Sequence, residues 1–180
     1  RCTIWQCNHK FGGDEKCGTP HLMEEDIQRY YLSAVNNLLT DRDDIIGTFE
    51  LAKNAAFDTT ALATEQDELQ SELLVVSELL QQCIQENAHI ALDQTEYQKR
   101  YDGLTERFNK AKARLDMVTA TISDKKARQA TIEAFLDELR RLDIVTEFQP
   151  ALWYSLVDFM TVYSKDDVRV TFKDSTEIQA

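Results

Sequence analysis

Two cysteines near the amino terminus are the side chains in this chain best suited to chemistry. Cys7 and Cys17 lie on either side of a glycine-bearing stretch, residues 8–13, which follows the strand-like segment 3–5. Cysteine thiolates around a glycine loop are ligands that Zn²⁺ prefers, and this pattern is typical of one half of a zinc ribbon. Because a structural zinc site needs four ligands, these two cysteines account for half of one.

The other half of such a site has no close match in the sequence. No second closely spaced cysteine pair remains, and Cys2, His9 and His21 are the only substitutes near the first pair. Cys2 lies five residues before Cys7, so in an extended strand its side chain points to the opposite face. Cys83 falls within a helical pattern, where we expect it to pack rather than to bind metal.

Common catalytic patterns are missing from the chain. No nucleophile, base and orienting residue are spaced as a triad, and no glycine-rich loop is suited to hold phosphate. The sequence begins at Arg1 in the middle of a pattern, so we expect a fragment of a longer protein. The fragment itself is not expected to be an enzyme.

Composition limits the class of protein further. The 180 residues are 43% hydrophobic and 29% charged, enough to bury one core and a second small one. No apolar run approaches the roughly 20 residues that span a bilayer, and no export signal opens the chain. We therefore expect a cytoplasmic protein without a membrane role, in which the four cysteines do not form disulfides. A net charge of −12 argues against nonspecific binding to phosphate backbones.

The middle of the chain carries the strongest pattern. Side chains spaced alternately four and three residues apart recur over 62–90 and again over 97–125, with a short link between them. The first series is Leu62, Gln66, Leu69, Leu73, Val76, Leu80, Cys83, Asn87 and Ile90. The second series is Tyr97, Tyr101, Leu104, Phe108, Ala111, Leu115, Val118, Ile122 and Lys125. These are the a and d positions of a coiled coil, and the short link predicts an antiparallel hairpin.

Charge indicates that the two helices pair with each other. Residues 58–96 contain nine acids and no Lys or Arg, whereas residues 97–128 contain nine basic residues and four acids. Two copies of the acidic helix would repel each other, so the complementary helix is the favoured partner. Folding back on this basis puts Leu73 near Leu115. The alternative, in which both helices pack along one long bundle, is not excluded by periodicity alone.

Shorter elements flank this arm. Apolar residues at helical spacing predict amphipathic helices over 24–39, from 41 to about 55, and from 129 to about 142. Pro150 suits the first turn of a short helix, and a β-hairpin follows, with strands at 160–163 and 168–172. The predicted fold is therefore mainly α, with a long antiparallel coiled-coil hairpin projecting from a small α+β base. Its expected parts are 1–57, 58–128 and 129–180.

Segments at both ends of the chain resemble large serine recombinases, the serine integrases of the resolvase and invertase superfamily. WQCNHK at 5–10, CGTPH at 17–21 and the acids of 24–26 look like the second half of that family's zinc ribbon. WYSLVD at 153–158, TVY at 161–163 and VRVTFKD at 168–174 resemble its closing segment. A long coiled-coil insertion between them is also typical of the family. One departure is Ser175, where the family often has glycine after the aspartate.

The resemblance implies a function for the longer protein. It would be a site-specific recombinase that integrates or excises mobile DNA such as a prophage, with its catalytic serine upstream of this fragment. Cys7 and Cys17 would match the second pair of zinc ligands, and the fragment without the first pair need not hold the metal. In that family the ribbon helps to bind DNA, and coiled-coil arms of different subunits meet during synapsis. A directionality factor can modulate those arms.

Two candidate contact regions follow. DNA contacts, if the fragment makes any, are expected from Arg1, Lys10 and Lys16, which outnumber the acids of the amino-terminal loop. The remaining base is mostly acidic, so we expect weak or absent DNA binding by this chain alone. The tip of the arm leaves apolar side chains beside a turn, and there the candidate partner contacts are Asn87, His89, Ile90 and Leu92.

A different class of protein also fits the sequence. A coiled-coil scaffold or adaptor unrelated to DNA would have the same arm, and its zinc-like end would then be incidental. The arm alone does not separate this alternative from a recombinase.

Overall fold

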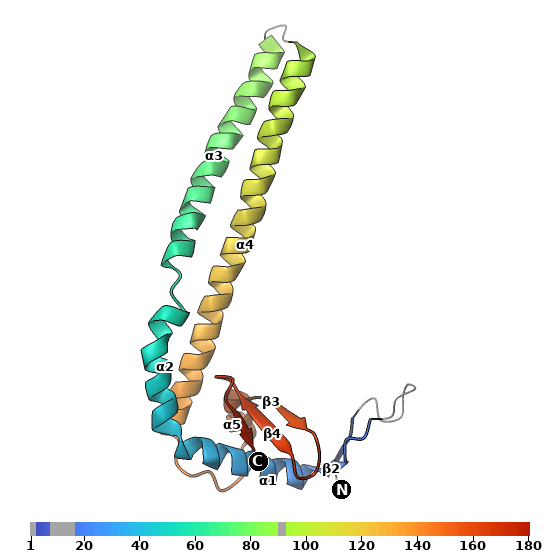
Figure 1. Ribbon diagram of the computed structural model, residues 1–180, viewed down its shortest axis with the longest axis vertical. Coiled ribbons are helices and arrows are strands. Elements are labelled where there is room, and N and C mark those ends of the chain that lie inside the picture. The colour runs from blue at the N-terminus through green and yellow to red at the C-terminus, as the bar shows by residue number, and fades with distance from the viewer. Residues whose placement is uncertain (1–2, 8–16, 90–92) are drawn as a thin grey trace. The chain divides into compact units, whose positions relative to one another are not determined.

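The computed structural model describes residues 3–7, 17–89 and 93–180. It is mainly helical, with one long helical hairpin and two small antiparallel sheets, and this confirms the predicted fold class. The chain divides into two units (Figure 1): residues 1–52 with 129–180, called the base here, and residues 53–128, called the arm.

Helix α1 (Glu24–Thr40) is the central helix of the base. The carboxylate of Asp26 accepts a hydrogen bond from the backbone N–H of Met23 at 3.2 Å, and three acids in the first turn suit the helix dipole. Its buried face consists of Tyr31, Ala34, Val35 and Leu38, as the apolar spacing predicts. Helix α2 (Arg42–Ala56) follows after a single residue, Asp41.

The base is completed by the end of helix α4 (Gln94–Arg141) and by a carboxy-terminal sheet. Ile132, Phe135, Leu136 and Leu139 form the buried face of this part of α4. The chain then returns to α1 and α2: Asn36 bonds the backbone of Val145 through both amide atoms, and Arg42 donates to the carbonyl of Leu142 at 3.0 Å. Helix α5 (Pro150–Leu156) begins at the predicted proline.

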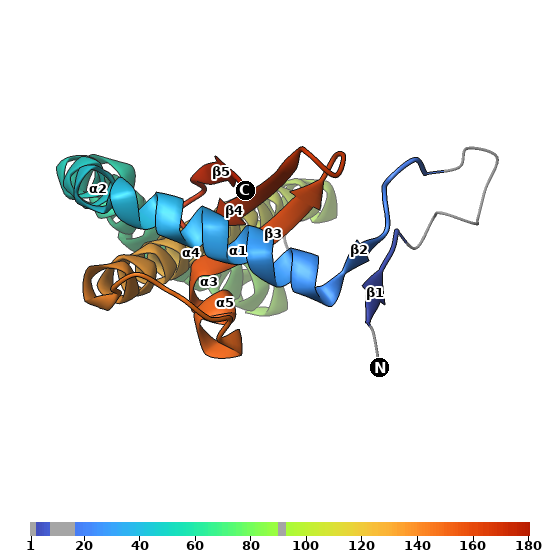
Figure 2. The same cartoon turned by 90° about the horizontal axis from the view of Figure 1, so that it is seen from below.

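The carboxy-terminal sheet has three strands in the order β3 (Val157–Val162), β4 (Val168–Phe172) and β5 (Glu177–Gln179). The predicted hairpin is present, and the third strand was not predicted. Ser175 lies in the turn before β5 with φ 75°, in the left-handed region that favours glycine. The side chain of Asp174 supports this turn by accepting from the backbone N–H of Thr176 at 2.9 Å. Contacts to β4 and β5 hold α1 against this sheet, as Figure 2 shows from below.

Aromatic side chains meet at the centre of the base. The Tyr31 ring lies 5.4 Å from that of Phe148 and 5.3 Å from that of Trp153, between centroids. Tyr31 is fully buried, and within the described part of the chain its hydroxyl has no hydrogen-bond partner. Burial raises the pKa of Tyr31 to about 12.

Tyr31→Phe should therefore raise the free energy of unfolding of the base by up to about 1 kcal/mol, because it removes an unsatisfied buried hydroxyl. Below pH 10 the side chain is neutral in both the folded and the unfolded chain. Between pH 10 and 12 the unfolded chain loses the phenolic proton first, so stability falls as pH rises. Urea unfolding at pH 8 and pH 11 tests this. If Tyr31→Phe lost as much unfolding free energy between these two pH values as the unmodified chain, the prediction would be contradicted.

The arm is an antiparallel pair formed by α3 (Thr60–His89) and the first part of α4 (Figure 1). Asp58 and Asp93 start the two helices: each accepts a hydrogen bond from the backbone N–H two residues on, at 2.8 Å. All described residues of the two heptad series are buried or half-buried, and Val76, Cys83, Ala111, Val118 and Ile122 are the most enclosed. The predicted seam is therefore confirmed.

The level at which the two helices meet differs from the prediction by about one helical turn. The Gln66 amide donates to the Thr119 hydroxyl at 2.8 Å. One heptad further along α3 and one heptad back along the antiparallel α4, this contact puts Leu73 level with about residue 112 rather than with Leu115. The prediction placed the turn between the two helices later in the chain than the structure does, because α3 already ends at His89. Lys125, the odd polar member of the seam, donates to the carbonyls of Ala56 and Asp58 at 3.2 Å.

Candidate functional site

The arm is held together by charge as well as by its apolar seam. Three arginines of α4 each form an ion pair with a glutamate of α3: Arg100 with Glu86, Arg107 with Glu72, and Arg114 with Glu65. The pairs of Arg107 and Arg114 use two guanidinium nitrogens each. Hydrogen bonds from these arginines hold the pKa values of the Glu72 and Glu65 carboxyls below their usual range. The arm thus satisfies its own charge complementarity, as the sequence predicted.

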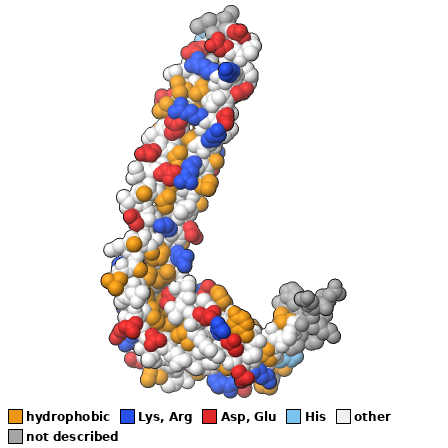
Figure 3. Space-filling view, viewed as in Figure 1, with side chains coloured by type: hydrophobic (Ala, Val, Ile, Leu, Met, Phe, Trp, Pro, Cys, Tyr) orange, Lys and Arg blue, Asp and Glu red, His pale blue; other side chains and the backbone are white. Residues whose placement is uncertain are grey.

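Large apolar side chains remain on the outside of the arm. Leu74 is 69% exposed and Val75 is 49% exposed, and both lie between the seam residues of α3 at positions that point away from α4. Ile84 of α3 and Met117 of α4 are also exposed. Figure 3 shows hydrophobic side chains among charged ones along the visible face of the arm. Adjacent exposed Leu and Val side chains are suited to contact with another protein.

The predicted tip contacts are only partly within the described structure. Asn87 is half-buried, and its side-chain oxygen accepts a hydrogen bond from the Gln94 amide at 3.1 Å. Asn87 therefore links the two helices rather than pointing freely outward. His89 is exposed at the end of α3. Ile90 and Leu92 lie outside the described residues.

The two predicted zinc ligands stand on a short amino-terminal hairpin. Strand β1 (Ile4–Trp5) pairs antiparallel with β2 (Leu22–Met23). Cys7 follows β1 and Cys17 precedes β2. Both side chains are half-buried, and the Cys17 sulfur lies 2.9 Å from the Thr19 hydroxyl. Residues 3–7, 17–89 and 93–180 contain no group of three His, Cys, Asp or Glu side chains that could hold a metal. Cys2, His9 and the predicted DNA contacts Arg1, Lys10 and Lys16 lie outside the described residues.

An apolar groove in the base was not anticipated from the sequence. It has a volume of about 750 Å³ and lies between the amino-terminal hairpin, the start of α1, helix α5 and strand β3. Its walls include Trp5, Phe148, Trp153 and Tyr154, and among the described lining residues the one charged side chain is that of Glu24. The Glu24 carboxylate accepts a hydrogen bond from the Trp5 indole. Because these residues are far apart in the sequence, no local pattern could have revealed the groove.

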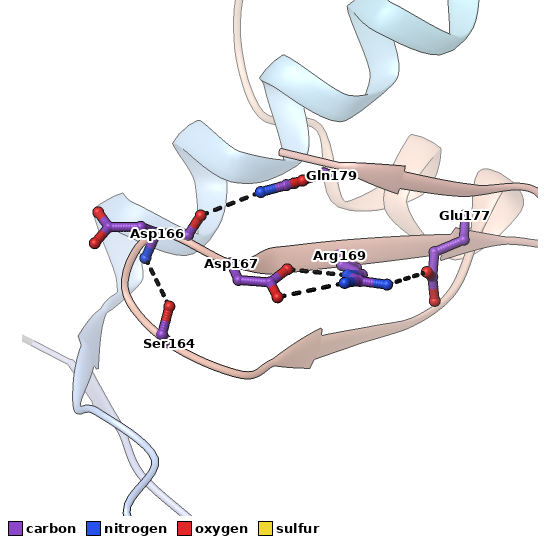
Figure 4. A network of polar contacts seen from close by, with 6 residues as sticks. All are labelled: Ser164, Asp166, Asp167, Arg169, Glu177 and Gln179. Atoms are coloured by element: carbon purple, nitrogen blue, oxygen red, sulfur yellow. Dashed lines mark hydrogen bonds and ion pairs between the residues drawn. The ribbon is translucent and has the colours of Figure 1, made fainter.

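Charged residues on the carboxy-terminal sheet form a structural network rather than a binding site (Figure 4). Arg169 on β4 bonds Asp167 at 2.9 Å and Glu177 of β5 at 3.0 Å, and its guanidinium also lies over the Tyr163 ring. The two carboxylates raise the pKa of Arg169 further above its usual range. Gln179 donates to the carbonyl of Asp166, which ties β5 to the turn between β3 and β4.

Comparisons with protein-family models, with curated proteins and with solved structures found no match. Within the described part of the chain, no helix is long and apolar enough to cross a membrane.

Proposed function

We propose that this chain is a DNA-binding and synapsis-control region of a site-specific serine recombinase, in which the arm makes contacts between subunits. The observation that carries the proposal is the arm itself. Its seam and its three interhelical ion pairs are satisfied internally, yet Leu74 and Val75 stay exposed on its outer side. Such an arm can fold without a partner and still has apolar surface to offer one.

The base gives a second line of support. The two segments on which the resemblance rests, 5–26 and 153–174, belong to one unit, and Trp5 and Trp153 line the same groove. A zinc ribbon followed by a closing sheet is the order expected for a recombinase of this family. In this reading zinc belongs to the intact parent protein, where Cys7 and Cys17 would be two of its ligands.

Charge favours protein contact over DNA contact for most of this chain. Residues 24–57 and 129–180 carry 17 acids and eight basic residues, and such a surface repels phosphate. DNA binding by the parent would therefore depend on its other parts and on the amino-terminal loop, and a directionality factor would act on the arm. A scaffold unrelated to DNA is the alternative, and it is favoured by the same acidic surface.

The contact is testable by sedimentation equilibrium. Replacing Leu74 and Val75 together by glutamate should convert a self-associating chain to monomer, because charge replaces the apolar contact. Circular dichroism should show unchanged helix content, since both side chains point away from the seam.

Gln81→Glu with Gln82→Glu is the matched control. These exposed residues occupy the same two heptad positions one heptad further along α3, so the control adds the same charge without removing apolar surface. It should associate like the unmodified chain. Equal association of the Leu74 and Val75 variant would contradict the proposed contact.

A further inference from the structure

The groove of the base has the chemistry of a peptide site. We propose that it binds an extended segment of another protein, rich in basic and apolar residues, which adds to strand β3 as a further strand. This site is separate from the contact surface proposed on the arm. A groove of this volume is within the range of ligand-binding sites, and its walls are mainly apolar and aromatic.

Strand β3 offers a free edge to such a segment. Within the described residues it is the outermost strand of its sheet and pairs with β4 alone. The backbone N–H of Tyr163 donates to the carbonyl of Asp167, and in an antiparallel pair every second residue faces the neighbouring strand. Thr161 therefore faces β4, whereas the backbone groups of Met160 and Val162 point outward. Both of these residues line the groove.

An unpaired strand edge beside apolar pockets is the arrangement used for recognition by strand addition. Backbone hydrogen bonds to Met160 and Val162 would give affinity without regard to sequence. Alternate side chains of the added strand would point into the groove, where Ile27 and Trp153 provide apolar surface. The side chains that enter the groove would therefore decide which segment binds.

Charge selects a basic segment. Among the described residues that line the groove, the Glu24 carboxylate is present and no Lys or Arg is. Glu24 lies beside the Trp5 indole, so an arginine or lysine could pair with the carboxylate and contact an aromatic face together. The chain as a whole carries a net charge of −12, which attracts a basic partner further.

A second copy of this chain is a poorer occupant. Its densest basic stretch, residues 97–128, is helical in α4 and is partly engaged by glutamates of α3. It therefore cannot present an extended strand without losing the arm. The partner is better sought in a different protein with an exposed basic and apolar segment.

Tryptophan fluorescence tests the site directly, because the two tryptophans of the chain, Trp5 and Trp153, both line the groove. The probe is a synthetic peptide of about eight residues in which pairs of valines alternate with pairs of arginines, so that each face of the strand carries both kinds of side chain. Titration should change the fluorescence and saturate with a Kd of about 1–100 µM. The same peptide with glutamate in place of each arginine should leave the fluorescence unchanged, and equal binding of both peptides would overturn the charge argument.

Two further experiments test the Glu24 side chain and the backbone pairing. Glu24→Gln should weaken binding of the arginine peptide by about tenfold or more, whereas Glu25→Gln, an exposed acid outside the groove, should not. Glutamine can still accept the indole hydrogen bond, so the hairpin should stay folded. A peptide N-methylated on alternate amides should lose binding, since it cannot pair with β3. Binding of that peptide like the unmodified one, or binding without a fluorescence change, would overturn the proposal.

Discussion

Replacing Phe135 by alanine should lower the free energy of unfolding of the base by about 3–5 kcal/mol. Phe135 is buried on the last part of α4, and its ring centroid lies 6.4 Å from that of Phe172 on β4. Truncation leaves a cavity between this helix and the sheet, so the base loses both transfer free energy and packing contacts. Because the two tryptophans of the chain belong to the base, urea unfolding followed by fluorescence reports on this unit.

Ile144→Ala is the control for Phe135. Ile144 belongs to the same unit but is 78% exposed, so its truncation should change the unfolding free energy by less than about 0.5 kcal/mol. If both variants unfolded at the same urea concentration, Phe135 would not be part of the core of the base.

Val118→Asp should have the largest effect on the arm. Val118 is 1% exposed in the seam between α3 and α4, and a carboxylate there has no basic partner among the apolar seam residues. A buried unpaired charge costs about 3–5 kcal/mol, enough to separate the two helices. Far-ultraviolet circular dichroism should therefore show helix loss at a lower temperature, while the tryptophan fluorescence of the base changes much less.

The neighbouring residue provides the control. Met117 is 61% exposed on the outer side of α4, so Met117→Asp adds the same charge without burying it. Its thermal transition should stay close to that of the unmodified chain. Equal loss of helix in the two variants would contradict the assignment of Val118 to the buried seam and of Met117 to the exposed side of α4.

The arm could be predicted because its information is local and repeated. Each heptad specifies the same face, and the charge difference between the two helices specifies the partner, as the pairs of Arg107 and Arg114 bear out. The level of pairing was less well determined, since it depends on where the turn begins. After a shift of one turn, each apolar residue of one helix still faces an apolar residue of the other, so the heptad pattern is the same for both levels.

The base was predicted in its elements but not in its assembly. Apolar spacing gave α1 and the hairpin of β3 and β4, whereas β5 is only three residues long and has no alternation to read. Its place depends on the turn at Ser175 and on Arg169, which bonds acids on both sides of it in sequence. The groove depends on a tertiary meeting of Trp5 with Trp153, and sequence spacing carries no signal for such contacts.

The mass of the unmodified chain in solution tests the role of the arm most directly. Sedimentation equilibrium at about 10–100 µM, a range suited to transient contacts, should show association of copies that increases with concentration. The exposed Leu74 and Val75 of the arm are the expected site of this association. A single-copy mass at every concentration in this range would contradict a contact between arms.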